Sequence, residues 1–244
     1  MALPRFVIVI AMVLVFAGAT PARSSGAAAA PATRKAQAST APAAPRAGPE
    51  RFEKSIAAYE AADRVNPPPK GAILFTGSST IGGWKTLASD FPDHQVINRG
   101  FGGSTIAEAT HFADRIVIPY APKMVLIRSG TNDIHAGKSA DEVFEDFKAF
   151  VAKVHAKLPE TDIVFIGLAP APSRWSERDE NRRLNEMVRK YAQGDNGVSY
   201  IDTYDTTVTP DGQPREELFV KDRLHFNAEG YKLLAERVRP HLPQ

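Results

Sequence analysis

Five short apolar runs separated by amphipathic stretches are the feature that most constrains the fold of this chain. Three of the runs are continuously apolar, which is typical of parallel strands covered by helices on both faces. Strands joined through helices require right-handed crossovers. The sequence therefore predicts an α/β fold, a three-layer α/β/α sandwich with a mostly parallel five-stranded sheet. The predicted strands are 72–76, 95–98, 124–128, 163–168 and 198–202, and the predicted helices are 52–66, 105–116, 139–158, 173–193 and 227–238.

Polar motifs follow the predicted strands at the point where each strand ends. Ser79 follows the first strand, Gly102 and Gly103 follow the second, and Asn132 follows the third. In parallel α/β sheets ligands bind outside the carboxyl ends of the strands. We therefore expect these motifs to meet at one rim of the sheet. The segment 222–225, between the last strand and the last helix, can reach the same rim.

A serine, an aspartate and a histidine in these motifs can perform nucleophilic catalysis. A hydroxyl nucleophile needs a base to accept its proton and a third group to orient that base. We predict Ser79 as nucleophile, His225 as base and Asp222 as the orienting acid, because His225 has an acid three residues before it in a loop. The competing histidines are His94, His111, His135, His155 and His241. The alternative role for Ser79 is a helix N-cap.

Four segments resemble, in order and spacing, the four blocks of the SGNH (GDSL-type) hydrolase family, which is esterase-like or lipase-like. They are Gly-Ser-Ser at 77–79, Asn-Arg-Gly-Phe-Gly-Gly-Ser-Thr at 98–105, Gly-Thr-Asn-Asp at 130–133 and Asp-Arg-Leu-His at 222–225. The resemblance covers roughly residues 70–240. One departure is Gly77-Ser78-Ser79-Thr80, where the family usually has Gly-Asp-Ser-Leu. That departure bears on the subfamily more than on the chemistry.

The resemblance implies a flavodoxin-like arrangement and an oxyanion hole made by Ser79, Gly103 and Asn132. Gly103 matches the family's oxyanion glycine better than Gly102, which remains the alternative. A glycine lets a backbone N–H approach a substrate closely, and an asparagine amide is a neutral donor. Positions 132 and 133 are also ordinary turn residues.

The chain is expected to be a secreted serine esterase that hydrolyses short acyl esters, acetyl esters above all, through an acyl-enzyme on Ser79. Its substrate is then a small-molecule or glycan acyl ester. The alternatives are a lysophospholipase or thioesterase of the same family, an O-acyltransferase, or a noncatalytic glycan-binding domain. No loop is apolar enough for a long acyl chain, so we expect an open, shallow site. No metal-ligand or phosphate-binding motif is present, and no metal or other cofactor is expected.

Composition separates the N-terminal segment from the rest of the chain. Residues 1–49 hold five of the 30 basic residues and no acidic one, so the remainder has 25 basic against 28 acidic residues. This balance argues against nucleic acid as a partner. We predict a signal peptide over 1–22, an Ala/Pro-rich disordered linker over 23–49 and one hydrolase domain over 50–244. With no cysteine, a bacterial periplasmic or secreted address is expected, without stable membrane insertion after cleavage. An uncleaved anchor is the alternative.

Overall fold

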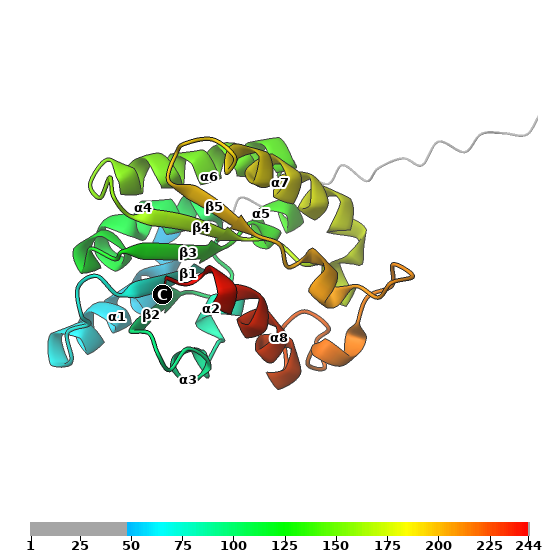
Figure 1. Cartoon of the computed structure of the whole chain (residues 1–244), viewed down its shortest axis with the longest axis horizontal. Helices are drawn as coiled ribbons and strands as arrows, with labels where there is room; N and C mark the ends of the chain where they lie inside the picture. The colour runs from blue at the N-terminus through cyan, green and yellow to red at the C-terminus, as the bar shows by residue number, and fades with distance from the viewer. Residues whose placement is uncertain (1–47, 244) are drawn as a thin grey trace, which may run out of the picture. The chain divides into compact units, whose positions relative to one another are not determined.

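The computed structural model describes residues 48–243, which form one parallel five-stranded sheet in the order β2-β1-β3-β4-β5 (Figure 1). The predicted signal peptide, and all of the predicted linker except Gly48 and Pro49, lie outside the described residues. The strands are β1 Ile73–Gly77, β2 Val96–Gly100, β3 Met124–Arg128, β4 Asp162–Ile166 and β5 Val198–Ile201. β1 and β3 pair in register from Ile73 opposite Met124 to Gly77 opposite Arg128. The predicted α/β fold is confirmed.

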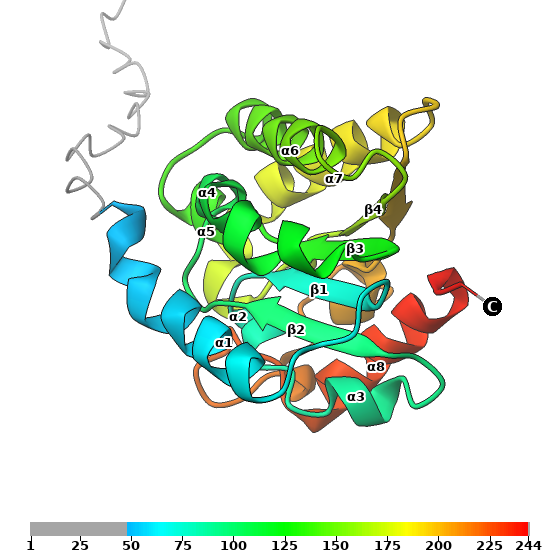
Figure 2. The same ribbon diagram turned by 90° about the vertical axis from the view of Figure 1, so that its left-hand side faces the viewer.

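Helices cover both faces of the sheet, as Figure 2 shows with α4 and α6 on one side and α3 and α8 on the other. Helices α1, α4, α6 and α7 pack on the first face, and α3 and α8 pack on the second. Two further short helices, α2 and α5, directly follow β1 and β3. The bounds are α1 Glu53–Val65, α2 Ser79–Gly82, α3 Leu87–Asp90, α4 Ile106–Ile116, α5 Thr131–His135, α6 Ala140–His155, α7 Arg178–Tyr191 and α8 Ala228–Val238.

Two hydrophobic cores lie on the two faces because successive side chains of a strand point in opposite directions. In β1, Leu74 is fully buried in the core with α4 and α6, while Phe75 is fully buried in the core with α8. Phe75 packs on Trp84 and Phe91 with ring centroids 5.8 and 5.6 Å apart. Trp84 lies between α2 and α3, and Phe91 directly follows α3. These ring contacts therefore hold both short helices against the sheet, including α2, which begins with Ser79.

The predicted helix over 173–193 is wrong in its first five residues. Residues Pro172–Glu177 form a 3-10 segment, η3, with Arg174 at φ −121° and ψ 28°, and α7 begins only at Arg178. The residue before a proline is biased away from helical angles, and Ala171 is extended before Pro172. Tertiary contacts of Ser173 and Arg174, described below, hold the rest of the segment out of the helix. The other predicted helices and all five strands are present, with ends shifted by a few residues.

Between residues 48 and 243, no helix is both long and apolar enough to cross a membrane.

Candidate active site

Gly77 shapes the junction that presents Ser79. Its φ is +133°, and a Cβ placed on it would lie 2.1 Å from the backbone oxygen of Arg128. Only glycine can combine this backbone conformation with so close an approach. β1 therefore ends tightly against β3, Ser78 is buried, and the partly exposed Ser79 begins α2 at the carboxyl rim of the sheet.

The loop after β2 is attached to the same junction. The Gly77 carbonyl accepts hydrogen bonds from the backbone N–H of Phe101 at 2.9 Å and from the Ser104 hydroxyl at 3.3 Å. A Cβ on Gly102 would lie 3.6 Å from the Ser79 Cβ. Gly103 has φ +83°, and a side chain there would meet no atom within 4 Å. Gly102 therefore lies against Ser79, and Gly103, the predicted oxyanion glycine, is the next residue along the loop.

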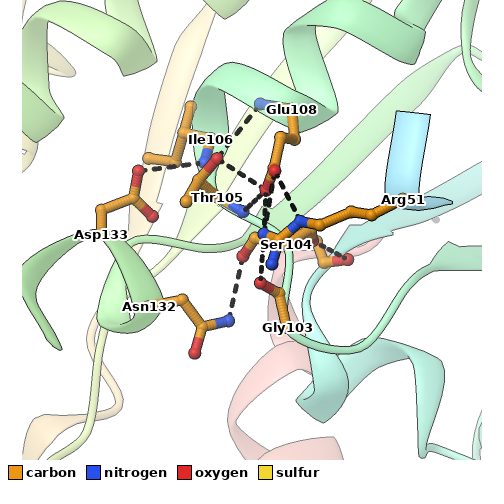
Figure 3. A network of polar contacts seen from close by, with 9 residues as sticks. Arg51, Gly103, Ser104, Thr105, Ile106, Glu108, Asn132 and Asp133 are labelled. Atoms are coloured by element: carbon orange, nitrogen blue, oxygen red, sulfur yellow. Dashed lines mark hydrogen bonds and ion pairs between the residues drawn. The ribbon is translucent and has the colours of Figure 1, made fainter. Parts of the chain in front are cut away.

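Figure 3 shows the polar network that holds this loop. The Arg51 guanidinium donates to the Gly103 carbonyl at 3.3 Å and forms an ion pair with Glu108 at 2.8 Å. Glu108 also accepts a hydrogen bond from the backbone N–H of Thr105, in a capping box that begins α4. Arg51 was not among the predicted site residues, because nothing in the local sequence links it to a loop 52 residues away.

Asn132 lies in α5 with its amide held at both ends. Its Nδ2 donates to the Ser104 carbonyl at 3.0 Å, and its Oδ1 accepts from Arg174 at 3.0 Å. Arg174 also donates to the Thr131 carbonyl at 3.2 Å. Because a guanidinium can only donate, it fixes which end of the amide carries oxygen. The donor end of Asn132 is therefore directed toward the 101–104 loop, as in Figure 3.

Asp222 and His225 occupy a tight turn between the bridged residues Phe219 and Phe226. Arg223 takes a left-handed conformation with φ +58°, and Asp222 Oδ1 accepts the backbone N–H groups of Leu224 and His225 at 2.9 and 3.0 Å. Asp222 Oδ2 lies 2.7 Å from Nδ1 of His225. This bond to His225 and the two backbone bonds lower the pKa of Asp222 to about 2. The carboxylate thus stays ionised at neutral pH and can orient the imidazole.

The 3-10 segment η3 connects this turn to Asn132. The backbone N–H of Ser173 donates to the Arg223 carbonyl at 3.0 Å, and the next residue, Arg174, binds Asn132. At the end of the same segment, Glu177 lies 2.6 Å from His135 of α5. His135, one of the competing histidines, therefore has a contact of its own away from Ser79. The local sequence of this segment gives no reason to expect this connecting role.

Two hollows meet at Ser79, the single lining residue that they share in the described part of the chain. The first is a more enclosed cavity of about 40 Å³ whose walls include Asn132, Arg128, Leu168, Asn181, Phe219 and Phe226. The second is an open groove of about 520 Å³ whose walls include His225, Gly102, Tyr59 and Ala58. The expected open, shallow site matches the groove only, because Phe219 and Phe226 close the cavity on the other side.

Asp133, next to Asn132, is fully buried and joins α5 to α4. Its Oδ1 accepts the backbone N–H of Ile106 at 3.3 Å, while its Oδ2 has no partner among the described residues. Burial raises the pKa of Asp133 to about 7, although Lys138 opposes the shift.

Across residues 48–243, no three His, Asp or Glu side chains are grouped so that they could hold a metal ion.

Comparisons with known proteins agree with the fold. Residues 55–233 match the model of the GDSL-like lipase/acylhydrolase family. The chain is 30% identical over 151 residues to bovine platelet-activating factor acetylhydrolase IB subunit alpha1, a match that spans 61% of this chain and 62% of that protein.

Two solved structures share the fold. A Streptococcus pneumoniae structure provisionally named as a platelet activating factor has a TM-score of 0.70 and 20% identity, over 80% of this chain and 94% of that one. A GDSL-like lipase from Bacteroides thetaiotaomicron has a TM-score of 0.64 and 21% identity, over 80% and 96%.

Proposed function

Since the chain belongs to the GDSL-like lipase/acylhydrolase family, we propose that it is an ester-hydrolysing enzyme, a serine esterase for short acyl groups. Acetyl is the acyl group that we favour, and a small molecule or a glycan carries it. The name of the bovine relative, an acetylhydrolase, supports this choice. The observation that carries the proposal is the Asp222–His225 pair, whose histidine lines the same groove as Ser79.

The proposed reaction proceeds through an acyl-enzyme. His225 accepts the proton of the Ser79 hydroxyl as its Oγ attacks the ester carbonyl carbon, and the carbonyl oxygen becomes an oxyanion. The backbone N–H groups of Ser79 and Gly103 and the Asn132 amide stabilise that oxyanion. His225 then gives its proton to the departing alcohol oxygen. Water, activated by the same imidazole, hydrolyses the acyl-enzyme, while Asp222 balances the imidazolium charge throughout.

Cavity size supports a short acyl group. A buried water needs roughly 10–15 Å³, so a cavity of about 40 Å³ accommodates a methyl group or a very short chain. A lysophospholipase or lipase would need a continuous apolar trough to gain about 0.8 kcal/mol for each buried CH₂. Arg128 and Asn181 in the cavity wall interrupt any such surface.

Replacement of Ser79 by alanine tests the proposal. We expect hydrolysis of p-nitrophenyl acetate to fall by at least about 10³-fold while the protein remains folded by circular dichroism, because the nucleophile is lost. Ser89→Ala is the matched control and should retain most activity, since that serine is exposed on α3 and lines neither hollow. Near-normal turnover by Ser79→Ala would refute the mechanism.

We also propose that the enzyme is exported, on the strength of the charged and then apolar start of residues 1–22. Expression of the full chain in a bacterium, followed by fractionation and N-terminal sequencing, tests this point separately from catalysis. Export predicts a periplasmic protein that begins close to residue 23. A full-length cytoplasmic protein would contradict it.

A further inference from the structure

The two hollows at Ser79 differ in which catalytic groups they contain. Asn132 lines the enclosed cavity and His225 lines the open groove, and neither residue lines both. We propose that the two hollows divide the ester: the cavity holds the acyl group, and the groove, which has α1 as one wall, holds a neutral alcohol. This inference rests on the proposed esterase function and adds the place and the chemical class of each half of the substrate.

Proton transfer determines the direction of binding. In the first half of the reaction, the bond between the carbonyl carbon and the alcohol oxygen breaks, and that oxygen takes the proton from His225. The departing oxygen must therefore lie within hydrogen-bond reach of the imidazole, on the groove side of Ser79. The acyl group, which stays on Ser79 Oγ, is then directed into the cavity with Asn132 in its wall.

The cavity wall selects against longer aliphatic chains. Asn181 is 1% exposed, and its Oδ1 has no hydrogen-bond partner among the described residues. Arg128 is also buried, and its guanidinium donates to the Gly167 carbonyl and to Thr203 rather than to a carboxylate. Water can satisfy the Asn181 oxygen while the cavity is empty or holds a small group. An aliphatic chain that displaces this water leaves a buried acceptor unsatisfied, which is unfavourable.

The groove has a different chemical character. Ser55, Ala58 and Tyr59 of α1 form one wall, and glycines at 82, 83, 100 and 102 lie in the rest of its lining. Within the described residues, no Asp, Glu, Lys or Arg lines it. The Tyr59 hydroxyl already donates to the Gly100 carbonyl at 2.5 Å, so the residue contributes mainly its ring. Such a surface suits a neutral alcohol whose ring can stack on Tyr59, and it offers no counter-charge to an ionic alcohol.

A tryptophan scan of α1 tests the groove. Ala58→Trp should lower the ratio of kcat/KM for 1-naphthyl acetate to that for ethyl acetate at least tenfold, because the indole fills the alcohol site. The ratio of p-nitrophenyl butyrate to p-nitrophenyl acetate should stay as in wild type. Ala57→Trp is the matched control, because Ala57 is exposed on the same helix and lies outside the groove lining. Its two ratios should both equal those of wild type.

A substitution in the cavity wall tests the acyl side of the assignment. Asn181→Ala removes the unsatisfied oxygen and adds no bulk to the cavity, so the butyrate-to-acetate ratio of kcat/KM should rise severalfold while the alcohol ratio stays constant. The neutral ester 3,3-dimethylbutyl acetate should be hydrolysed better than acetylcholine, its cationic isostere. A change of acyl-length preference in Ala58→Trp, or a preference for acetylcholine, would overturn the assignment.

The control experiments also separate this inference from the proposed function. If wild type hydrolyses none of these esters, the esterase proposal itself fails. If wild type is active and Ala58→Trp behaves like Ala57→Trp, the division of the substrate fails while the esterase proposal stands.

Discussion

At the scale of single residues, the site depends on side chains whose orientation is fixed by neighbours that donate to or accept from them. Asn132 illustrates this: its amide oxygen is held by Arg174 and its amide nitrogen by the Ser104 carbonyl. A donor held in place before the reaction stabilises developing charge without reorganisation. The same argument applies to Asp222, whose second carboxylate oxygen orients His225.

Asn132→Ala is expected to reduce kcat about 10²–10³-fold and to leave KM largely unchanged, because an oxyanion donor acts mainly in the transition state. Steady-state kinetics with p-nitrophenyl acetate measures both constants, and thermal unfolding checks that the variant is intact. A rise in KM at constant kcat would instead identify Asn132 as a contact to the bound substrate.

At the scale of elements, η3 separates what the sequence could predict from what it could not. Strands and long helices were predicted from the hydrophobic pattern of neighbouring residues. The motif residues were predicted from short local motifs and the family resemblance; they are Ser79, Gly103, Asn132, Asp222 and His225. The 3-10 turn at 172–177 depends on bonds from Ser173 and Arg174 to partners 50 and 42 residues away in the chain. Such long-range contacts cannot be predicted from the local sequence. For the same reason, the sequence did not predict that Arg51 binds the 101–104 loop or that Asn181 lines the cavity.

We expect Arg174→Ala to lower kcat about 10–100-fold, since a hydrogen bond to a charged donor is worth about 1.5–3 kcal/mol. If Arg174 acts by positioning Asn132, the same substitution should have little further effect in an Asn132→Ala background. A double-mutant cycle in kcat measures this coupling. Additive losses would show that Arg174 acts on the substrate or the fold by another route.

At the scale of the whole molecule, burial of Asp133 couples stability to pH. The pKa of this carboxyl is about 7 in the folded protein and 3.8 as an ordinary aspartate, so between these values the folded state binds a proton that the unfolded state does not. Stability must therefore fall as pH rises from about 4 to about 7. Each pKa unit corresponds to about 1.4 kcal/mol, and the total effect is expected to reach a few kcal/mol.

Asp133→Asn should remove this contribution, because an amide can still accept the Ile106 N–H and does not ionise. Urea unfolding at pH 5 and pH 8 gives the free energy of unfolding of each protein. The value for the variant minus that for wild type should be larger at pH 8 than at pH 5. Asp162→Asn, at an exposed position, is the control, and its unfolding free energy relative to wild type should be the same at both pH values. An unchanged difference for Asp133→Asn would mean that the buried carboxyl is already ionised at pH 5.

The distance in sequence between Ser79 and His225 has a consequence for biosynthesis. Ser79 leaves the ribosome 146 residues before His225, and the sheet order places β1 inside the sheet and β5 at an edge. A nascent or truncated chain can contain the nucleophile, but it lacks the turn at 219–226 that supplies the base. In the proposed mechanism, ester hydrolysis therefore begins only once this last part of the domain has docked, and the time at which activity appears measures the completion of folding.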